Sequence, residues 1–368
     1  MGKAMRALGT MSGTSMDGID VALIETDGED VVSRGPSQTF PYESAFRAQL
    51  ARTIEDAKAL AERRAWTGSL AETERELTNL HAAAIESFLQ HNQLARTTID
   101  VIAFHGHTVL HAPRQRLTVQ IGDGPGLARR LGISVVYDLR AADCAAGGQG
   151  APLAPVYHRA LAARLPERPV VVLNIGGVAN VTWIGRDGTL IAFDSGPGNA
   201  LIDDWMARHT GKGVDADGRA AAAGHISQTA LTALLTHDYF GALPPKSLDR
   251  NAFSAVPVAS LGLEDGAATL TAFTALSIAR AREHFPEQPE LWVITGGGRR
   301  NKTLMAMIAE RVECAVAPAE AAGMDGDAME AEAWAYLAVR SMKGLPISFP
   351  GTTGVPRPLT GGVLARAR

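Results

Sequence analysis

The chain has 368 residues, of which 46% are hydrophobic and 20% charged, a composition typical of a globular protein long enough for two lobes. Its 35 basic and 39 acidic residues give a net charge of −4, which provides no electrostatic reason to expect nucleic acid or an anionic membrane as a partner. Two cysteines exclude a disulfide scaffold, and without an apolar leader or a membrane-length apolar run we expect a cytoplasmic protein.

The first stretch with chemical character is Met5–Thr26, MRALGTMSGTSMDGIDVALIET. Two apolar runs flank Gly13–Gly18, so the pattern predicts a β-hairpin. Its tip combines two glycines, two hydroxyls and a carboxylate, which suits a polyphosphate carrying Mg²⁺. A solvated loop without chemistry is the alternative for this stretch taken alone.

The next elements build the first lobe. Periodicity predicts helices over Glu43–Trp66 and Ser69–Asn92, the second with Ser69 and Glu72 in capping-box spacing. Apolar runs then predict strands over Ile99–Phe104, Leu117–Ile121 and Ile133–Leu139. We expect no catalytic group on the two helices.

Histidines follow the strand that ends at Phe104. His105 and His107 stand on one side if the strand continues, so they are candidates for a metal site, for the polar lining of a cleft, or for structural roles. No Cys or carboxylate stands at a supporting spacing, which disfavours the metal site.

Glycine-rich segments mark the middle of the chain. Gly147–Gly150 is a hinge candidate. Val170–Gly188 repeats the pattern of the first hairpin, with Gly176 and Gly177 at its turn, and this faint repeat favours two lobes of related build. Each lobe then offers a loop that can face phosphate.

A strand over Leu190–Phe193 is predicted to end at Asp194, before a helix over Ala200–His209. A carboxylate at a strand end beside a glycine-rich helix entrance is a typical place for a catalytic base or metal ligand. A turn or cap residue is the alternative for Asp194.

The remaining pattern alternates helices and loops. We predict helices over Ala220–Phe240, Ala267–Phe285, Lys302–Val312 and Asp327–Met342, and a strand over Leu291–Thr295. The polar loop Leu243–Asn251 is either solvated or directed at substrate. The turn Gly296–Gly298, between strand and helix, lets a ring or phosphate lie against the backbone.

The usual nucleotide motifs are missing: the sequence has no G-x-x-x-x-G-K-[ST], no helix-opening G-x-G-x-x-G and no protein-kinase signature. Three spaced glycine elements remain, at Gly13–Gly18, Gly176–Gly177 and Gly296–Gly298. In that order they resemble the two phosphate loops and the adenosine loop of the superfamily of acetate and sugar kinases, actin and heat-shock chaperones.

Within that superfamily the chain resembles the anhydro-N-acetylmuramic acid kinase family. The resemblance rests on MSGTSMDGID (Met11–Asp20), HGHTVLH (His105–His111), VQIGD (Val119–Asp123), AAGGQGAPLAP (Ala145–Pro155), NIGGVANVT (Asn174–Thr182), FDSGPGN (Phe193–Asn199) and TGGGRRN (Thr295–Asn301). One departure is HGHT where many relatives have HGQT.

The resemblance implies an α/β, two-lobed actin-like ATPase (ribonuclease H-like) fold with ATP in the interlobe cleft. We expect residues 1–138 to form the N-terminal lobe and 139–368 the C-terminal lobe, with the C-terminal tail returning to the first lobe. The implied reaction converts 1,6-anhydro-N-acetylmuramic acid and ATP, with Mg²⁺, into N-acetylmuramic acid 6-phosphate during peptidoglycan recycling. The sequence leaves the oligomeric state open, with a homodimer as one expectation.

The resemblance also implies roles for individual residues. The ATP-binding residues are Gly13, Thr14, Ser15, Met16, Asp17, Gly18, Ile19 and Asp20, with Gly176, Gly177, Gly296, Gly297 and Gly298. Asp17 and Asp20 are the Mg²⁺ candidates, Asp194 is the catalytic base, and His107, Arg140 and Glu330 are expected near the sugar.

In the implied mechanism Asp194 takes a proton from water attacking the anomeric carbon, while the released O6 attacks the γ-phosphorus. Two alternatives stay open: a kinase for an ordinary sugar or carboxylate hydroxyl, and a non-enzymatic nucleotide switch such as an actin-like filament former or a sugar-responsive repressor. A repressor needs a basic helix-turn-helix segment, which the sequence does not show.

Overall fold

The computed structural model describes residues 3–13, 15–63, 66 and 68–367. The chain forms two compact units: unit 1 contains the residues up to Ala163 together with those from Ala328, and unit 2 is Arg164–Asp327. These limits differ from the predicted lobes 1–138 and 139–368, because Leu139–Ala163 and the C-terminal residues group with the N-terminal ones.

Unit 1 is built on a six-stranded sheet with the order β13-β7-β4-β1-β2-β3. The strands are β1 (Met5–Met11), β2 (Gly18–Thr26), β3 (Val32–Pro41), β4 (Val101–Phe104), β7 (Val135–Tyr137) and β13 (Val363–Ala365). β1, β2 and β3 are antiparallel neighbours, β4 and β7 run parallel to β1, and β13 closes the edge antiparallel to β7.

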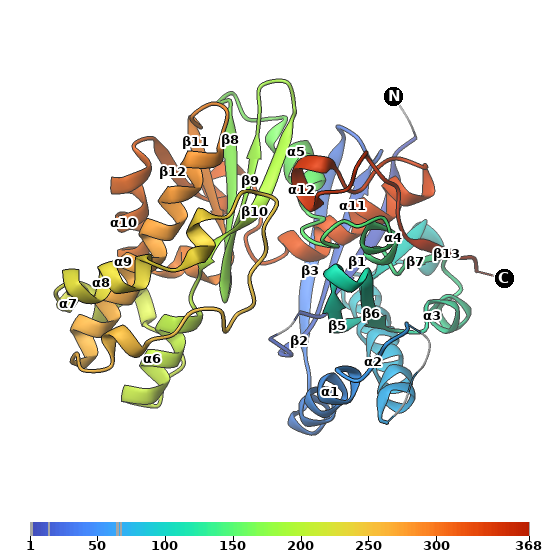
Figure 1. The fold of residues 1–368 in the computed structure, drawn as a ribbon. Helices are drawn as coiled ribbons and strands as arrows, with labels where there is room; N and C mark the ends of the chain where they lie inside the picture. The colour runs from blue at the N-terminus through green and yellow to red at the C-terminus, as the bar shows by residue number, and fades with distance from the viewer. Residues whose placement is uncertain (1–2, 14, 64–65, 67, 368) are drawn as a thin grey trace. The chain divides into compact units, whose positions relative to one another are not determined.

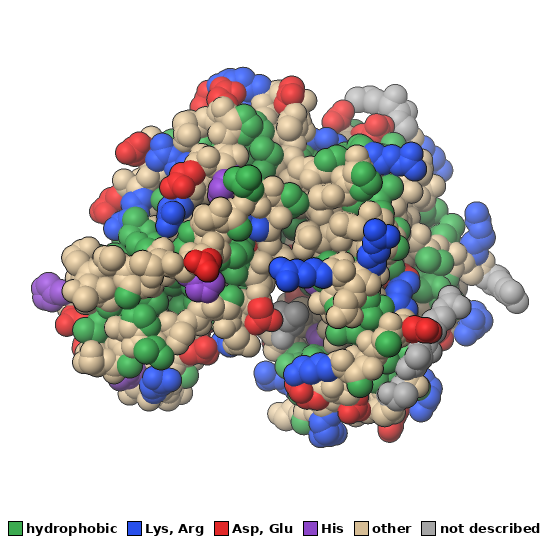
Figure 2. Space-filling model, in the orientation of Figure 1, with side chains coloured by type: hydrophobic (Ala, Val, Ile, Leu, Met, Phe, Trp, Pro, Cys, Tyr) green, Lys and Arg blue, Asp and Glu red, His purple; other side chains and the backbone are tan. Residues whose placement is uncertain are grey.

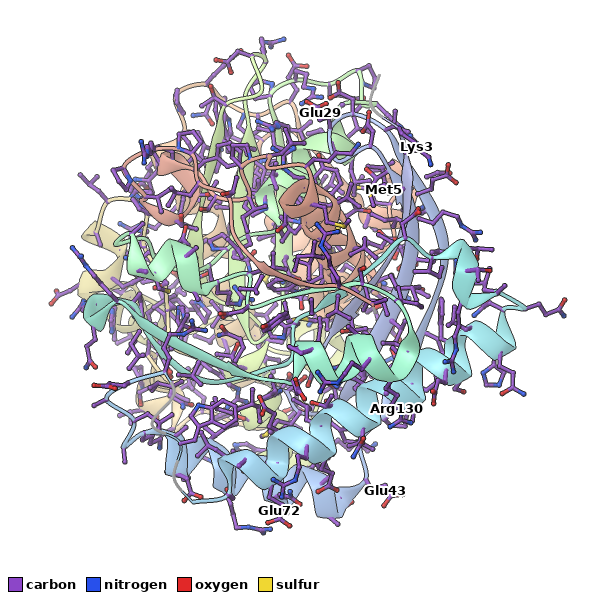
Figure 3. All side chains as sticks on the ribbon, turned by 90° about the vertical axis from the view of Figure 1, so that its right-hand side faces the viewer. Lys3, Met5, Glu29, Glu43, Glu72 and Arg130 are labelled. Atoms are coloured by element: carbon purple, nitrogen blue, oxygen red, sulfur yellow. The ribbon has the colours of Figure 1, made fainter. Side chains whose placement is uncertain are left out.

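Helices α1 (Ser44–Ala57), α2 (Leu70–His91) and α3 (Gly124–Leu131) and the hairpin of β5 (His107–Ala112) and β6 (Leu117–Ile121) share one hydrophobic core with this sheet. Figure 3 shows Glu72 near the start of α2 and Arg130 on α3. Arg130 joins the two helices, because its guanidinium donates to Asn79 Oδ1 at 3.0 Å and to Glu86 Oε2 at 3.1 Å.

Helix α11 (Met329–Met342) packs directly on β1, β2 and β4. The approach depends on Gly9, because a Cβ there would overlap the Ala331 carbonyl oxygen. Short helices α4 (Ala141–Ala145), α5 (Pro155–Ala162) and α12 (Pro350–Thr353) complete unit 1.

Unit 2 is built on a five-stranded sheet with the order β10-β9-β8-β11-β12 (Figure 1). The strands are β8 (Val170–Ile175), β9 (Val178–Ile184), β10 (Leu190–Pro197), β11 (Leu291–Thr295) and β12 (Ala315–Pro318). Its helices are α6 (Ala200–Thr210), α7 (Arg219–Ala223), α8 (Gln228–Leu235), α9 (Leu263–Arg280) and α10 (Lys302–Val312).

The two sheets repeat one topology. In each, three consecutive strands pair antiparallel, a later strand pairs in parallel with the first of them, and a further strand pairs in parallel with that one. This is the ribonuclease H-like strand order, so the predicted α/β fold with two related halves is confirmed.

Some predicted elements differ from the observed ones. The helix predicted over Ala220–Phe240 is two helices, because Gly224 approaches the Glu264 backbone too closely for a side chain and Ser227 caps α8. Ser69 makes no cap bond to α2; its hydroxyl donates to Asp56 Oδ2 at 2.8 Å. Strand β3 was missed, because it is an exposed edge containing Pro36 and lacks alternating apolar residues.

On the face drawn in Figure 2, basic and acidic side chains of the described residues are interspersed, which agrees with the nearly balanced composition. Among the described residues, the helices are too short or too polar to cross a membrane.

Candidate active site

The predicted hairpin tip connects β1 to β2 in unit 1. Met16 has a left-handed backbone (φ 54°), and its N–H donates to Gly13 O at 3.0 Å, which closes the turn. Gly18 is required because a Cβ there would overlap the Phe40 carbonyl oxygen of β3. Thr14 lies outside the described residues.

A buried hydrogen-bonded chain lies under this tip. Tyr42 OH donates to Ser12 Oγ at 2.8 Å, and Ser12 Oγ lies 2.9 Å from His107 Nδ1. His107 is fully buried, which lowers its pKa to about 4, so the imidazole is neutral at pH 7. In the described part of the chain His107 Nε2 has no partner. His107 therefore supports the residue directly before the loop.

Asp17 is exposed in the turn, and Asp20 is half-buried on β2. Ser15 Oγ donates to Asp17 Oδ1 at 2.8 Å, and Thr39 Oγ1 donates to Asp20 Oδ1 at 2.5 Å. Burial raises the pKa of Glu330, and the negative charges of Asp20 and Asp17 raise it further. Within the described residues three or more His, Cys, Asp or Glu never gather into a metal-binding group.

Arg140, Glu330 and Trp334 join the start of α4 to α11. The Arg140 guanidinium lies 5.0 Å from the Trp334 ring centroid and donates to Gly150 O at 2.9 Å. Trp334 Nε1 lies 3.0 Å from Met11 Sδ, directly before the hairpin tip. Loss of surrounding water raises the pKa of Glu330, and Arg140 opposes that rise. Unit 1 thus brings the first loop close to Arg140 and Glu330.

The loop Gly147–Gly150, predicted as a hinge, lies inside unit 1. Asp143 Oδ1 accepts from Gly150 N at 2.6 Å, and Gln149 N donates to Thr353 O at 2.7 Å. Thr353 Oγ1 also donates to Asp143 Oδ2 at 2.6 Å. The chain passes between the units elsewhere, at Ala163–Arg164 and Asp327–Ala328.

In unit 2 the β8–β9 turn, Gly176 and Gly177, meets the start of α6. Asn199 N donates to Gly176 O at 2.7 Å and Gly198 N to Gly177 O at 3.0 Å. A Cβ on Gly198 would overlap the Gly176 carbonyl oxygen, which explains the glycine in FDSGPGN. The amides at the entrance of α6 therefore fix the two-glycine turn against the start of this helix.

The Gly296–Gly298 turn after β11 lies against the end of β8. Gly296 has a left-handed φ of 74°, and a side chain on Gly298 would overlap Ile175. The Asn199 side chain lies between the two glycine turns, 3.3 Å from the Cβ position of Gly298. Unit 2 therefore brings the predicted second phosphate turn and adenosine turn together.

Asp194 lies on β10, which continues to Pro197 instead of ending at Phe193 as predicted. A β-bulge between Asp194 and Gly196 interrupts the register, and such bulges often redirect a side chain next to a site. Leu248 N donates to Asp194 Oδ2 at 2.7 Å, and Tyr239 OH donates to Asp194 O at 2.5 Å. In the described part of the chain Oδ1 has no hydrogen-bond partner.

Burial raises the pKa of Asp194 to about 7, and the Leu248 N–H opposes this rise. A carboxyl group with this pKa exists in both protonation states near neutral pH, as a general acid or base requires. Asp194 therefore combines a fixed oxygen with one that can exchange a proton.

Sequence reasoning did not identify Ser12, Trp334, Tyr239 or Leu248. Ser12, which is buried, stands between the end of β1 and the predicted tip, so its hydroxyl at that junction was the available signal. The other three act through contacts between residues far apart in the chain, for which the sequence offers no pattern.

Comparisons with known proteins show the family of the chain. The family model described as anhydro-N-acetylmuramic acid kinase matches residues 5–367. The relatives of that name from Agrobacterium fabrum and Rhodospirillum rubrum are 52% and 54% identical over 100% and 98% of this chain, covering 100% and 94% of their own lengths. The relative from Methylobacterium nodulans is 53% identical over 98% of this chain and 100% of its own length. This chain therefore belongs to the anhydro-N-acetylmuramic acid kinase family.

Proposed function

We propose that this chain converts 1,6-anhydro-N-acetylmuramic acid, ATP and water into N-acetylmuramic acid 6-phosphate and ADP, as a step of peptidoglycan recycling. The match to the family model over residues 5–367 carries the substrate assignment. The half-buried Asp194, with its pKa near 7, supports the chemistry.

The anhydro sugar has no free O6 hydroxyl, so a base has no sugar proton to remove. Asp194 Oδ1 instead accepts a proton from a water molecule as that water bonds to the anomeric carbon. The bond from the anomeric carbon to O6 breaks, and O6 bonds to the γ-phosphorus as ADP leaves. The Leu248 amide keeps Oδ2 in place while Oδ1 takes the proton.

The ATP phosphates are assigned to the amides of Gly13–Gly18 and to Gly176 and Gly177, and the adenosine to Gly296–Gly298. Mg²⁺ neutralises phosphate charge when it is bound, and Asp17 and Asp20 are the carboxylates that would hold it, directly or through water. One glycine at each turn supports this assignment: a Cβ on Gly18 would overlap the Phe40 carbonyl oxygen, and a Cβ on Gly198, beside the second turn, would overlap the Gly176 carbonyl oxygen.

Arg140 and Glu330 are proposed to contact the sugar, since both are polar groups close to the first loop. For His107 the proposed contribution to substrate binding is made through Ser12, because the imidazole is buried. ATP as the phosphoryl donor favours a cytoplasmic location, and the homodimer stays a prediction.

The test of the proposed function is ATP consumption by the purified protein with anhydro-N-acetylmuramic acid, compared with glucose, N-acetylglucosamine and acetate. We expect turnover with the anhydro sugar alone. Equal or faster turnover of any other acceptor would favour an ordinary hydroxyl kinase, and no turnover with any of them would favour a nucleotide switch.

The water step has its own test. In ¹⁸O-water the anomeric hydroxyl should take up the label while the transferred phosphate stays unlabelled, because the phosphate's bridging oxygen is the sugar's own O6. The product must be examined before mutarotation exchanges the hydroxyl. An unlabelled anomeric oxygen would reject the role of Asp194 in directing water.

A further inference from the structure

The segment Pro244–Asn251, which we call the strap, carries polar residues for which the proposed reaction has no role. It links the short helix η4 (Asp238–Gly241) to the residues before α9. The sequence left open whether this loop is solvated or directed at substrate. Within unit 2 the strap contacts two places, Asp194 and the Gly176–Gly177 turn.

The first point is the base. Asp194 N donates to Lys246 O at 3.0 Å, and Leu248 N donates back to Asp194 Oδ2 at 2.7 Å. The Leu248 side chain packs against the hydrophobic cluster around Trp205 and Phe253. The strap is therefore fixed to Asp194 by its backbone and to the core by Leu248.

The second point is the phosphate turn. Arg250 Cγ and Nε each lie 3.8 Å from the Cβ position of Gly177. Its Nη2 donates to Asp204 Oδ1, on α6, at 2.8 Å. Burial raises the pKa of Asp203, near the start of α6, to about 6. Arg250 is close enough to this carboxyl to oppose that rise. A guanidinium thus stands beside the turn assigned to phosphate.

The other cation of the strap points elsewhere. Lys246 Nζ lies 3.3 Å from His284 Nε2 and 4.8 Å from the centre of the Tyr239 ring. Lys246 is therefore held by His284 and the Tyr239 ring. Arg250 is the strap residue placed to meet phosphate.

We propose that Arg250 binds the terminal phosphate of ATP, and that the strap sets the distance between this contact and Asp194. The inference rests on the assignment of Gly176 and Gly177 to phosphate. The terminal phosphate is favoured because Arg250 follows Leu248 by two residues, and Leu248 holds the base that acts at the reacting centre. An exposed ion pair such as Arg250–Asp204 is weak, whereas a guanidinium binds phosphate through two parallel hydrogen bonds.

The test uses the full chain and measures the affinities of ADP and of a non-hydrolysable ATP analogue by calorimetry, with Mg²⁺ and without sugar. In Arg250→Ala we expect the analogue to bind about 10-fold or more weakly and ADP to bind within about 2-fold of the original protein. With sugar, kcat should fall by about 10²-fold or more. Added guanidinium should restore part of the kcat of Arg250→Ala. The kcat and the analogue affinity of Arg250→Lys should lie between those of the original protein and those of Arg250→Ala.

Two control variants separate phosphate binding from structure. Arg186 is the matched arginine, since its side chain is 55% exposed against 52% for Arg250 and pairs with Glu287 and Glu290; Arg186→Ala should change neither affinity. Asp204→Asn removes the partner of Arg250 but should keep the preference for the ATP analogue over ADP. Equal weakening of both nucleotides in Arg250→Ala, or loss of the preference in Asp204→Asn, would overturn the inference.

Failure of this inference can be told from failure of the proposed function. If the original protein phosphorylates the anhydro sugar and Arg250→Ala keeps the preference for the ATP analogue, the inference alone is wrong. If the sugar is not phosphorylated but Arg250→Ala abolishes that preference, the proposed function is wrong and the phosphate contact stands.

Discussion

Burial of the Asp194 carboxyl acts on catalysis and on stability in opposite directions. It raises the pKa to about 7 from an ordinary value of 3.8, which brings the proton affinity close to that needed at neutral pH. It also means that the folded protein must hold a poorly solvated charge once Asp194 ionises. Both consequences can be measured on the same side chain.

Asp194→Asn should lower kcat by about 10²- to 10⁴-fold, because the amide keeps the shape but cannot accept the proton. The affinity for Mg²⁺-ATP should stay within a few-fold, since the glycine turns hold the phosphates. Calorimetry alongside steady-state kinetics checks both numbers. A parallel loss of nucleotide affinity would instead identify Asp194 as a metal ligand.

The pH dependence follows from the same shift. The base works ionised, so kcat should decline as pH falls below about 7. Between pH 4 and 7 the folded state holds a proton that the unfolded state has released, so the free energy of unfolding should fall with rising pH by at most about 1.4 kcal/mol per unit. Asp194→Asn should lack this slope in urea titrations at several pH values. Parallel slopes in both proteins would contradict the assigned pKa.

The glycines show which roles of single residues can be predicted from the sequence. The sequence predicted turns at Gly176–Gly177 and Gly296–Gly298, and the structure has them between β8 and β9 and after β11, because turn chemistry is local. It could not show that Gly9 and Gly224 serve close packing, because their neighbours, Ala331 and Glu264, are distant in the chain.

Among the elements, α11 on β1 is the contact most sensitive to added volume. Gly9→Ala would place a methyl group on the Ala331 backbone, so we expect a loss of about 1–3 kcal/mol or more in the free energy of unfolding, measured with urea. Gly213→Ala is the control, since nothing lies within 4 Å of its Cβ position. Equal midpoints for the two variants would contradict the close approach of α11.

The first loop depends on the buried Tyr42–Ser12–His107 chain. Tyr42→Phe removes the 2.8 Å bond to Ser12 Oγ, so KM for ATP should rise several-fold, in line with a net hydrogen bond of about 1 kcal/mol, while kcat changes less. Tyr336→Phe is the control, because its hydroxyl bonds to Glu29 O at 2.7 Å, away from the loop. A similar KM in both variants would mean that Ser12 is held by other contacts.

Element prediction succeeded where local patterns decide the structure. The hairpins and α10 follow apolar runs with glycine turns or clear periodicity, and the predicted helix Lys302–Val312 is observed exactly. The strap illustrates the limit: its polar residues indicate a loop, but its attachment to Asp194 depends on pairing across 54 positions of chain.

At the scale of the whole molecule, the two units differ in how they use the chain. Unit 2 is one continuous segment with its own sheet and cores, whereas unit 1 needs residues from both ends. We therefore expect the fragment 164–327 to unfold cooperatively by itself. The fragment 1–163 should not, because it lacks α11 and the β13 edge strand.

Circular dichroism during urea unfolding distinguishes the two fragments. Mixing 1–163 with a peptide of residues 328–368 should restore cooperativity in part, because the missing helix and strand are then supplied in trans. A steep transition for 1–163 alone would show that the sheet of unit 1 tolerates the loss of α11.

The discontinuity of unit 1 also sets an order of events at the ribosome. Residues 164–327 are all synthesised before Ala328, so the sequence of unit 2 is complete while α11 and β13 are still unmade. Until α11 has been made, it cannot cover its face of β1, β2 and β4. Unit 1 is therefore the first unit to be started and the last to be completed during synthesis. A chaperone that binds apolar strands would have the longest time to act on the residues that are made first.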